Sequence, residues 1–463
     1  MKAPDLVRRA ALRCDTIAMI RQTRENMTSW LISLKTKWWF YLAGRKYKHE
    51  QYAEALELTQ KVVHVRPNFA GALVRAGACL RNLKRYDEAT GCFEQALQKS
   101  RNYGEPHAYL SLVLCDLGRY QEAIEALNRA FRIYPSLANS EFWLCQLGFV
   151  RGKAGQYEEA LAAYTKLTEL NGESQAAWSG VGWANAQLKS YSEAAQAYER
   201  AAALNPKDAD VQGNLGSLFL ELKRLNEAIH HLRQSIRLAP TAERYCDLSR
   251  ANCEEGAFDK ALAPALEALT LDPKLEEGYV LLSQIYGELG QRQEAVNALK
   301  TGLQLLPDNG TIYSQLAQHY LDLRMLPESA QASKEAIRLL PDSFEDYGRL
   351  GYALQEQGNI DEAVPALEKS LGLNSNQYQS NVNLGAIYLA QRRFEEALGL
   401  FRRAEEIDPN DATLHYNLGE LYVRSGKRGE ALIQLQILRA LNPQFAAELE
   451  ELIKSESARN ESS

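Results

Sequence analysis

The tetrapeptide Tyr52-Ala53-Glu54-Ala55 decides the fold of this 463-residue chain, because its pattern returns at nearly constant intervals. In most copies an anchor residue is followed by a variable residue, then Glu, then Ala. The interval is 34 residues in nine of eleven cases, with 37 before Tyr157 and 33 before Phe258. The other anchors are Tyr86, Tyr120, Tyr191, Leu225, Arg292, Leu326, Ile360, Phe394 and Arg428. Twelve repeats in phase predict a solenoid rather than separate globular domains.

Other residue types recur in phase with the anchor. Nine residues before each anchor stands Gly, Ala or Ser, as at Gly77 and Gly385, and the residue before that is most often Leu. Small side chains at this position allow two helices to approach closely. Pro stands fifteen residues after nine of the twelve anchors, as at Pro67, and ends the second helix of the unit because it has no N–H. Gly118 and five other glycines fall in the turn between helices, where left-handed backbone is commonly needed.

This set of positions resembles the tetratricopeptide repeat family over residues 36–445. The resemblance implies an all-α fold, a right-handed α-α superhelical solenoid of about twelve 34-residue units with capping helices at both ends. It also implies that the first helix of each unit lines a concave groove that binds peptides or folded partners. We expect residues 1–35 to form a basic N-terminal helical cap or extension. Residues 446–463 are expected to form a C-terminal capping helix that is followed by a disordered tail.

The charge of the chain is unevenly distributed. The formal net charge is −6, yet residues 1–48 carry 11 Lys and Arg against 3 Asp and Glu. Because phosphate binding relies on clustered cations, the acidic remainder argues against nucleic acid as a partner. The seven cysteines form no C-x-x-C pair and indicate reduced thiols in a cytoplasmic location. No stretch approaches the ~18 consecutive apolar residues that a membrane-spanning helix needs, so we expect no such helix.

Helical spacing places the second, fifth, sixth, ninth and thirteenth residues of each first helix toward the groove. The thirteenth position is acidic in five successive repeats, as Glu221, Glu254, Glu288, Asp322 and Glu356. A carboxylate near a helix C-terminus opposes the helix dipole by ~0.3–1 kcal/mol. Five such placements favour a groove that binds basic segments, and simple solvation of an exposed face is the alternative interpretation.

Repeats three to five place large apolar side chains at groove positions instead. These are Tyr109, Leu112, Phe142, Phe149 and Trp183. Aromatic side chains on a concave surface often anchor a partner's apolar groups, although any one of them can turn inward and pack. The sixth position adds Asn214, Asn383 and Asn417, where some family members use amides to grip a peptide backbone. The family's clamp for a chaperone C-terminal carboxylate is not matched by any three adjacent repeats, so that ligand is not expected.

The N-terminal segment has two interpretations. Residues 1–35 are basic and lead into Trp38, Trp39, Phe40 and Tyr41. A capping helix that covers the first repeat is one interpretation, because solenoid ends require a cap. The other is an amphipathic segment that touches an anionic membrane surface or a partner.

No catalytic or metal-binding motif stands out in the sequence, and the repeats leave no segment that could form a catalytic domain. We therefore predict no enzyme activity, no cofactor and no metal site. The predicted function is a protein-interaction scaffold or adaptor whose groove binds partner peptides or proteins. Two alternatives are a self-assembling scaffold, in which the repeats of one copy receive the basic N-terminus of another, and a membrane-peripheral assembly factor. RNA binding by the repeats is disfavoured by the acidic body.

Overall fold

The protein is built from helical hairpins, as predicted. The computed structural model describes residues 27, 30–100 and 102–461, and every regular element within these ranges is a helix. The first helices of the twelve hairpins are residues 30–48, α3 (Ala70–Asn82), α5 (Glu105–Asp116), α7 (Glu141–Lys153), α9 (Gln175–Gln187), α11 (Ala209–Glu221), α13 (Ala242–Glu254), α15 (Glu276–Glu288), α17 (Gly310–Asp322), α19 (Phe344–Glu356), α21 (Tyr378–Ala390) and α23 (Ala412–Arg424).

Every anchor residue of the sequence pattern is the first residue of a second helix. These helices are α2 (Tyr52–Val65), α4 (Tyr86–Lys99), α6 (Tyr120–Ile133), α8 (Tyr157–Leu170), α10 (Tyr191–Leu204), α12 (Leu225–Leu238), α14 (Phe258–Leu271), α16 (Arg292–Leu305), α18 (Leu326–Leu339), α20 (Ile360–Leu373), α22 (Phe394–Ile407) and α24 (Arg428–Leu441). The longer interval before Tyr157 contains a short 3-10 helix, η1 (Pro135–Asn139). The shorter one before Phe258 leaves only residues 239–241 between α12 and α13.

All twelve turns within hairpins contain one residue with positive φ. Six of these residues are glycines, as the sequence predicted, with φ from 73° to 80°. The other six are long polar residues at the same repeat position, namely Glu50, Lys84, Lys189, Lys223, Arg324 and Arg392. A left-handed conformation costs a non-glycine residue about 1 kcal/mol, so half of the turns store a small strain. The turn geometry is therefore kept even where glycine is absent.

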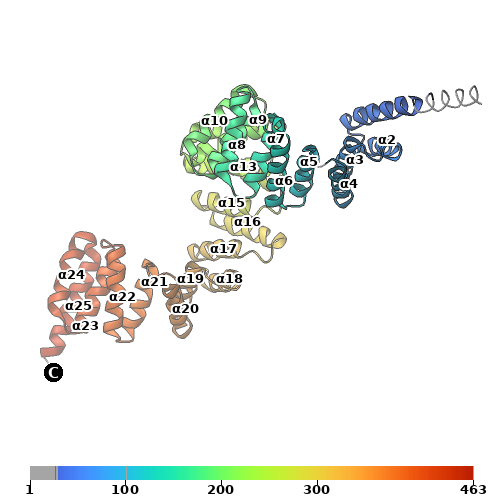
Figure 1. Ribbon diagram of the computed structural model, residues 1–463. Coiled ribbons are helices and arrows are strands. Elements are labelled where there is room, and N and C mark those ends of the chain that lie inside the picture. The colour runs from blue at the N-terminus through green and yellow to red at the C-terminus, as the bar shows by residue number, and fades with distance from the viewer. Residues whose placement is uncertain (1–26, 28–29, 101, 462–463) are drawn as a thin grey trace, which may run out of the picture. The chain divides into compact units, whose positions relative to one another are not determined.

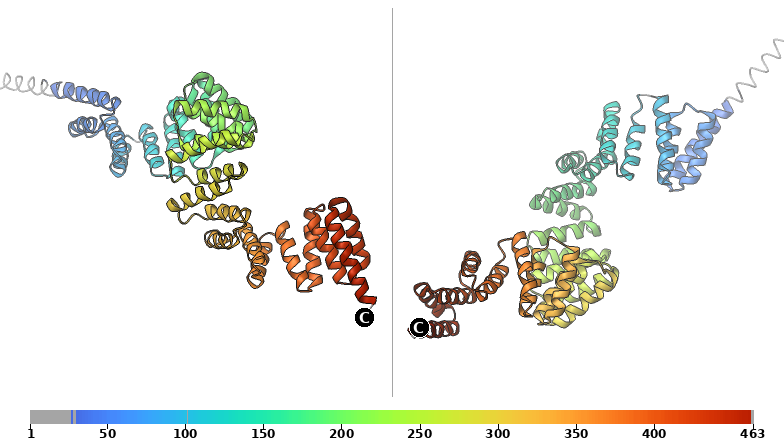
Figure 2. Two further views of the ribbon diagram at one scale, coloured as in Figure 1. Left: turned by 180° about the vertical axis from the view of Figure 1, so that it is seen from behind. Right: turned by 90° about the horizontal axis from the view of Figure 1, so that it is seen from below.

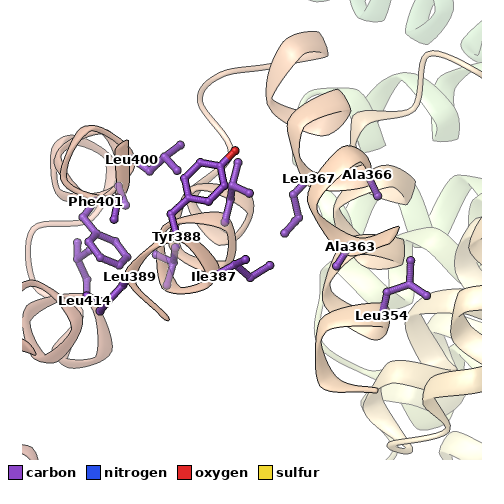
Figure 3. Close-up of a cluster of buried hydrophobic side chains, with 14 of the residues drawn as sticks. Leu354, Ala363, Ala366, Leu367, Ile387, Tyr388, Leu389, Leu400, Phe401 and Leu414 are labelled. Carbon is purple, nitrogen blue, oxygen red and sulfur yellow. The ribbon is translucent and has the colours of Figure 1, made fainter. Parts of the chain in front are cut away.

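In several hairpins the small residue of the first helix is required by a large side chain of the second helix. A Cβ added to Gly77 would lie 2.5 Å from Phe93, and one added to Gly385 would lie 2.6 Å from Phe401. Phe93 and Phe401 are both fully buried. Figure 3 shows Phe401 beside Leu389 and Leu414 in the core cluster that joins repeats nine to twelve. The two helices of such a hairpin can therefore approach closely because the aromatic ring of the second helix packs directly on the glycine of the first.

The chain forms two compact units, Met1–Leu222 and Lys223–Ser463. Within each unit the second helix of a hairpin packs on the first helix of the next, as the successive pairs in Figures 1 and 2 show. The second unit ends in α25 (Pro443–Glu461), which packs against α23 and α24 through Ala446, Leu449 and Ile453. This helix extends to Glu461, and the disordered tail that the sequence predicted after it stays a prediction. An ion pair between Lys454 and Glu450 spans one turn of the helix.

Most of the expected N-terminal cap, residues 1–35, lies outside the described residues. Within residues 30–35 only Ser33 is half-buried, and the other side chains are exposed. The helix that they begin continues without a break through residue 48 as the first helix of repeat one. The capping role of this segment stays a prediction.

Candidate functional site

A cleft of the first unit lies on the first helices of repeats one to three. Its volume is about 940 Å³. The helix of residues 30–48 contributes Lys37, Phe40, Tyr41, Arg45, Tyr47 and Lys48, α3 contributes Val74 and Arg75, and Tyr103, Glu105 and Tyr109 come from α5 and the loop before it. We call this surface the basic cleft, because five Lys and Arg side chains, Arg66 included, line it against one carboxylate, Glu105.

Arg75 is a half-buried cation of the basic cleft. Its Nη1 donates a hydrogen bond of 2.6 Å to the carbonyl oxygen of Phe40, and its guanidinium lies 3.7 Å from the centre of the Phe40 ring. Burial lowers the pKa of Arg75, because removing water disfavours the charged form. Glu105 does not pair with it and instead accepts a hydrogen bond from the hydroxyl of Tyr103. The guanidinium therefore has no carboxylate partner among the described residues.

The rim of the basic cleft carries further cations. Lys37, Arg45 and Lys48 are exposed, and none of them forms an ion pair within the described part of the chain. By contrast, the neighbouring Lys46 pairs with Glu54 at 2.7 Å. The cleft consequently presents positive charge that the protein does not neutralise itself.

Sequence reasoning missed the basic cleft, although its signal was present. Lys37, Phe40, Tyr41 and Lys48 occupy the second, fifth, sixth and thirteenth positions of repeat one, and Arg75 occupies the sixth position of repeat two. These are the positions that helical spacing directs to the groove. If these positions are compared one repeat at a time, they carry basic residues in repeats one and two and are acidic at the thirteenth position of repeats six to ten.

The predicted aromatic surface of repeats three to five is only partly displayed. Phe142 and Phe149 are exposed, at 52% and 43% of their surface. Tyr109 is half-buried, lines the basic cleft and packs edge-on against Trp143, with ring centres 5.5 Å apart. Phe142 also packs against Trp143, at 4.8 Å, so this unpredicted side chain joins two of the predicted ones.

Two residues of the predicted aromatic surface, Leu112 and Trp183, pack against neighbouring helices instead. Leu112 was expected to face the groove, but it is 4% exposed and belongs to the core formed with Trp143 and Leu147. The prediction was wrong for this residue because the ninth position of repeat three turns against the next hairpin. Trp183 is half-buried, and its ring covers Gly152, where an added Cβ would lie 2.4 Å from it.

The acidic row is divided between the two units, because Glu221 belongs to the first and the other four to the second. Glu254 accepts hydrogen bonds from Lys223 at 2.8 and 2.9 Å, and Glu356 lies 3.5 Å from Arg324. Both cations are positive-φ residues of the preceding hairpin turn. Inter-repeat ion pairs therefore account for two of the five carboxylates.

The remaining acidic positions are less engaged. Asp322 accepts a hydrogen bond of 2.9 Å from Gln318. Glu221 and Glu288 are exposed and form no ion pair in the described parts of the chain. The row is thus a partly neutralised surface rather than five free carboxylates.

The three predicted asparagines differ in accessibility. Asn214 is exposed and Asn417 is half-buried. Asn383 was expected on the groove surface, but it is 6% exposed and its Oδ1 accepts a hydrogen bond from Gln379. That expectation was wrong because the amide is covered by its neighbours and already occupied.

Arg349, at the sixth position of repeat ten, lies in a local network between repeats nine and ten. Its guanidinium donates to Asp346 at 2.6 Å, to Ser314 at 3.0 Å and to Gln318 at 3.1 Å. Asp346 is fully buried and belongs to the same helix, so this ion pair orients the guanidinium. The hydrogen bonds to Ser314 and Gln318 then link α19 to α17. Arg349 acts as an internal contact rather than a free groove cation.

Neither a membrane-spanning helix nor a metal site is found in the described ranges. No helix among residues 27, 30–100 and 102–461 is long and apolar enough to cross a bilayer. The same ranges hold no group of three or more His, Cys, Asp and Glu side chains that could bind a metal ion.

Comparisons with known proteins identify the repeat. Family models described as tetratricopeptide repeat match residues 68–136, 107–173, 146–209, 185–251, 276–309, 349–412 and 388–454. No curated protein matches the sequence.

Solved structures resemble the chain at low identity. Cut9-Hcn1 of an APC/C hetero-tetramer is 12% identical, with 93% of this chain and 98% of that one covered and a TM-score of 0.46. Pseudomonas aeruginosa pilF is 19% identical over 45% of this chain and 96% of that one, with a TM-score of 0.43. Yeast Tom70 is 14% identical over 93% and 97%, with a TM-score of 0.39.

Proposed function

Because the chain belongs to the tetratricopeptide repeat family, we propose that it is a non-enzymatic scaffold that binds segments of partner proteins on the first-helix faces of its hairpins. The ligand of the first unit is an acidic, extended polypeptide segment that occupies the basic cleft. The proposal needs no cofactor and no metal ion.

The observation that carries this proposal is the unpaired guanidinium of Arg75. Its charge is disfavoured by burial, and the one carboxylate of the cleft is held by Tyr103. A carboxylate from a partner would compensate the buried charge and form a charge-assisted hydrogen bond, which contributes about 1.5–3 kcal/mol. The rim cations Lys37, Arg45 and Lys48 would add attraction at longer range.

The shape of the cleft suits an extended chain with mixed side chains. Phe40, Tyr41 and Phe69 offer apolar ring surface, and Tyr47 and Tyr109 add amphipathic side chains beside it. Aromatic side chains with a polar tip are frequent in binding surfaces because they bury area at low entropic cost. The exposed Phe142 and Phe149, with Trp183, Asn214 and Glu221, are proposed to extend the binding surface along the first unit.

A second, weaker candidate is a basic segment on the second unit. The exposed carboxylates of Glu288 and Asp322 support it, with Glu254, Glu356 and Asn417 as further contacts. To bind there, a lysine or arginine would have to compete with Lys223 and Arg324 for two of the carboxylates. Exposed ion pairs contribute only about 0–1 kcal/mol, so such competition is feasible.

Fluorescence anisotropy on the full chain tests the proposal with labelled acidic, basic and neutral peptides of equal length. We expect the acidic peptide to bind best to the wild type, and Arg75→Gln to weaken it by about tenfold or more, from the loss of one charge-assisted hydrogen bond. Added salt should weaken binding further, because the rim cations are exposed.

Two controls keep this experiment interpretable. Arg132→Gln removes an exposed cation of α6 that donates a hydrogen bond to the carbonyl oxygen of Asn128 in its own helix, and it should leave peptide affinity unchanged. The rim variant Lys37→Gln, Arg45→Gln and Lys48→Gln should lower affinity without altering the half-buried Arg75. Equal binding of all peptides, or tighter binding of single-stranded RNA than of the acidic peptide, would overturn the proposal.

We further propose a reducing, cytoplasmic location, supported by the cysteine pattern of the sequence. Cell fractionation with an antibody to the native protein tests it, and recovery only from an oxidising compartment would refute it.

A further inference from the structure

The helix of residues 30–48 carries an apolar face that no other described residue covers. Trp30, Leu31, Leu34, Trp38 and Tyr41 lie on one side of this helix, because Leu34 is four residues from Trp30 and three from Leu31, and Trp38 and Tyr41 follow after four and three more. Met27, three residues before Trp30, is exposed as well. We call these six residues the apolar stripe. Their exposed fractions range from 45% for Leu34 to 61% for Trp30. Single exposed apolar residues are ordinary, but a continuous set of this size marks an interaction surface.

The apolar stripe is framed by positive charge. Lys35 and Lys37 lie beside it, and together with Leu31, Leu34, Trp38 and Tyr41 they line a shallow hollow. The sequence contains no Asp or Glu between Glu25 and Glu50, whereas this interval contains five Lys and Arg residues. An apolar face that is rich in Trp and bordered by lysines is the pattern of a helix that lies in a membrane interface.

We propose that the apolar stripe docks this protein on an anionic lipid bilayer, with the helix of residues 30–48 lying in the plane of the interface. Trp30, Trp38 and Tyr41 would lie at headgroup depth, where amphipathic rings are favoured. Leu31 and Leu34 would enter the acyl boundary, and Lys35 and Lys37 would reach the lipid phosphates. Trp30, Leu31, Leu34 and Trp38 do not line the basic cleft, so they contact only the lipid. Lys37 and Tyr41 line both surfaces and would be shared by the two ligands.

Charge argues against two occupants that the chain itself could supply, namely the same face of a second copy and residues 1–26. A second copy that paired through the same face would bring two acid-free, lysine-bordered helices together, and like charges across a helix pair are destabilising. Residues 1–26 carry six Lys and Arg against three Asp and Glu, so this segment is also basic. An anionic surface is the partner whose charge is complementary to both the stripe and the segment before it.

Vesicle co-sedimentation of the full chain tests the proposal. We expect binding to phosphatidylcholine vesicles that contain phosphatidylserine and little binding to phosphatidylcholine alone. Trp30→Gln with Trp38→Gln should reduce the partition coefficient by about tenfold or more, since the stripe loses its two largest apolar anchors. Lys35→Glu, which leaves the basic cleft unchanged, should reduce it by about fivefold or more.

The matched control is Leu432→Gln with Ile433→Gln, which removes two exposed apolar side chains of α24 and should leave vesicle binding unchanged. The Trp30 and Trp38 variant should still bind the acidic peptide, so failure of lipid docking is distinguishable from failure of the peptide site. Three results would overturn the proposal: unchanged vesicle binding in that variant, equal binding to neutral vesicles, or a wild-type dimer in solution that the variant abolishes.

Discussion

Substitution of Gly385 by Ala should destabilise the second unit, although alanine is the better helix former. A Cβ at this position would lie 2.6 Å from Cε1 and 2.8 Å from Cδ1 of Phe401. Ordinary carbon contacts are about 3.5–4.0 Å, and the Phe401 ring is fully buried and has no open side to move into. Overpacking of this kind costs about 1–3 kcal/mol, while the helix gains about 1 kcal/mol from alanine. The difference is a net loss of up to about 2 kcal/mol.

Gly399 provides the matched control because it lies in the middle of α22, the helix that carries Phe401. A Cβ there would meet nothing within 4 Å. Gly399→Ala should therefore stabilise the protein by about 0.5–1 kcal/mol through backbone entropy alone. The two substitutions are chemically identical and differ only in the space around the new methyl group.

Urea unfolding followed by helical circular dichroism measures the overall effect, and hydrogen exchange of peptides from α21 and α22 localises it. Local readout matters because repeat arrays lose stability hairpin by hairpin rather than all at once. In a Phe401→Leu background, Gly385→Ala should cost about 1–2 kcal/mol less than in the wild type, since the clashing ring is gone. The reasoning is refuted if Gly385→Ala stabilises as much as Gly399→Ala, or if the Phe401→Leu background changes nothing.

Four further results are expected. Gly290→Ala should cost about 1 kcal/mol in urea unfolding, because φ is 73° there and nothing crowds the site, so unchanged stability would contradict the left-handed turn. Burial lowers the pKa of His319, so the imidazole binds a proton more readily in the unfolded chain than in the folded one. The melting temperature should therefore fall as the pH drops below the ordinary histidine pKa, and it should fall less in His319→Gln. Burial raises the pKa of the Cys79 thiol to about 11, so at pH 8 mass spectrometry should find it alkylated at least about tenfold more slowly than a free thiol. Arg349→Met should cost about 3 kcal/mol by stranding the buried Asp346 carboxylate, and Asp346→Asn in the same chain should recover part of that loss in thermal unfolding.

Several details of the fold were predictable because they depend on residues close together in sequence. The anchors Tyr52 and Phe394 begin their helices, and Gly118 has the positive φ that a tight turn requires. The small residue nine positions before each anchor was predicted from helix packing. In the structure, the rings of Phe93 and Phe401 occupy the space that a larger side chain at Gly77 or Gly385 would need. Such features repeat every 34 residues, so each of the twelve copies supports the others.

The candidate site was predicted less well because its properties depend on neighbouring repeats. Phe142 is exposed and Tyr109 is half-buried, and helical spacing could not show that Leu112 is covered by the next hairpin. It also could not show that Glu254 is neutralised by Lys223, which lies 31 residues earlier. Whether a charge is free depends on the rotation and rise from one hairpin to the next, which spacing within one helix does not contain.

The sequence by itself therefore determined the all-α repeat, the helix boundaries and the turn positions, since these follow from local propensity and a strict period. Only the tertiary structure decided which charged side chains pair and which remain available. It left Arg75 half-buried without a carboxylate and exposed the apolar stripe around Trp30 and Trp38, while Glu356 was paired with Arg324. The physical reason is that burial and ion pairing are properties of surfaces that meet in space, and those surfaces form only when hairpins stack.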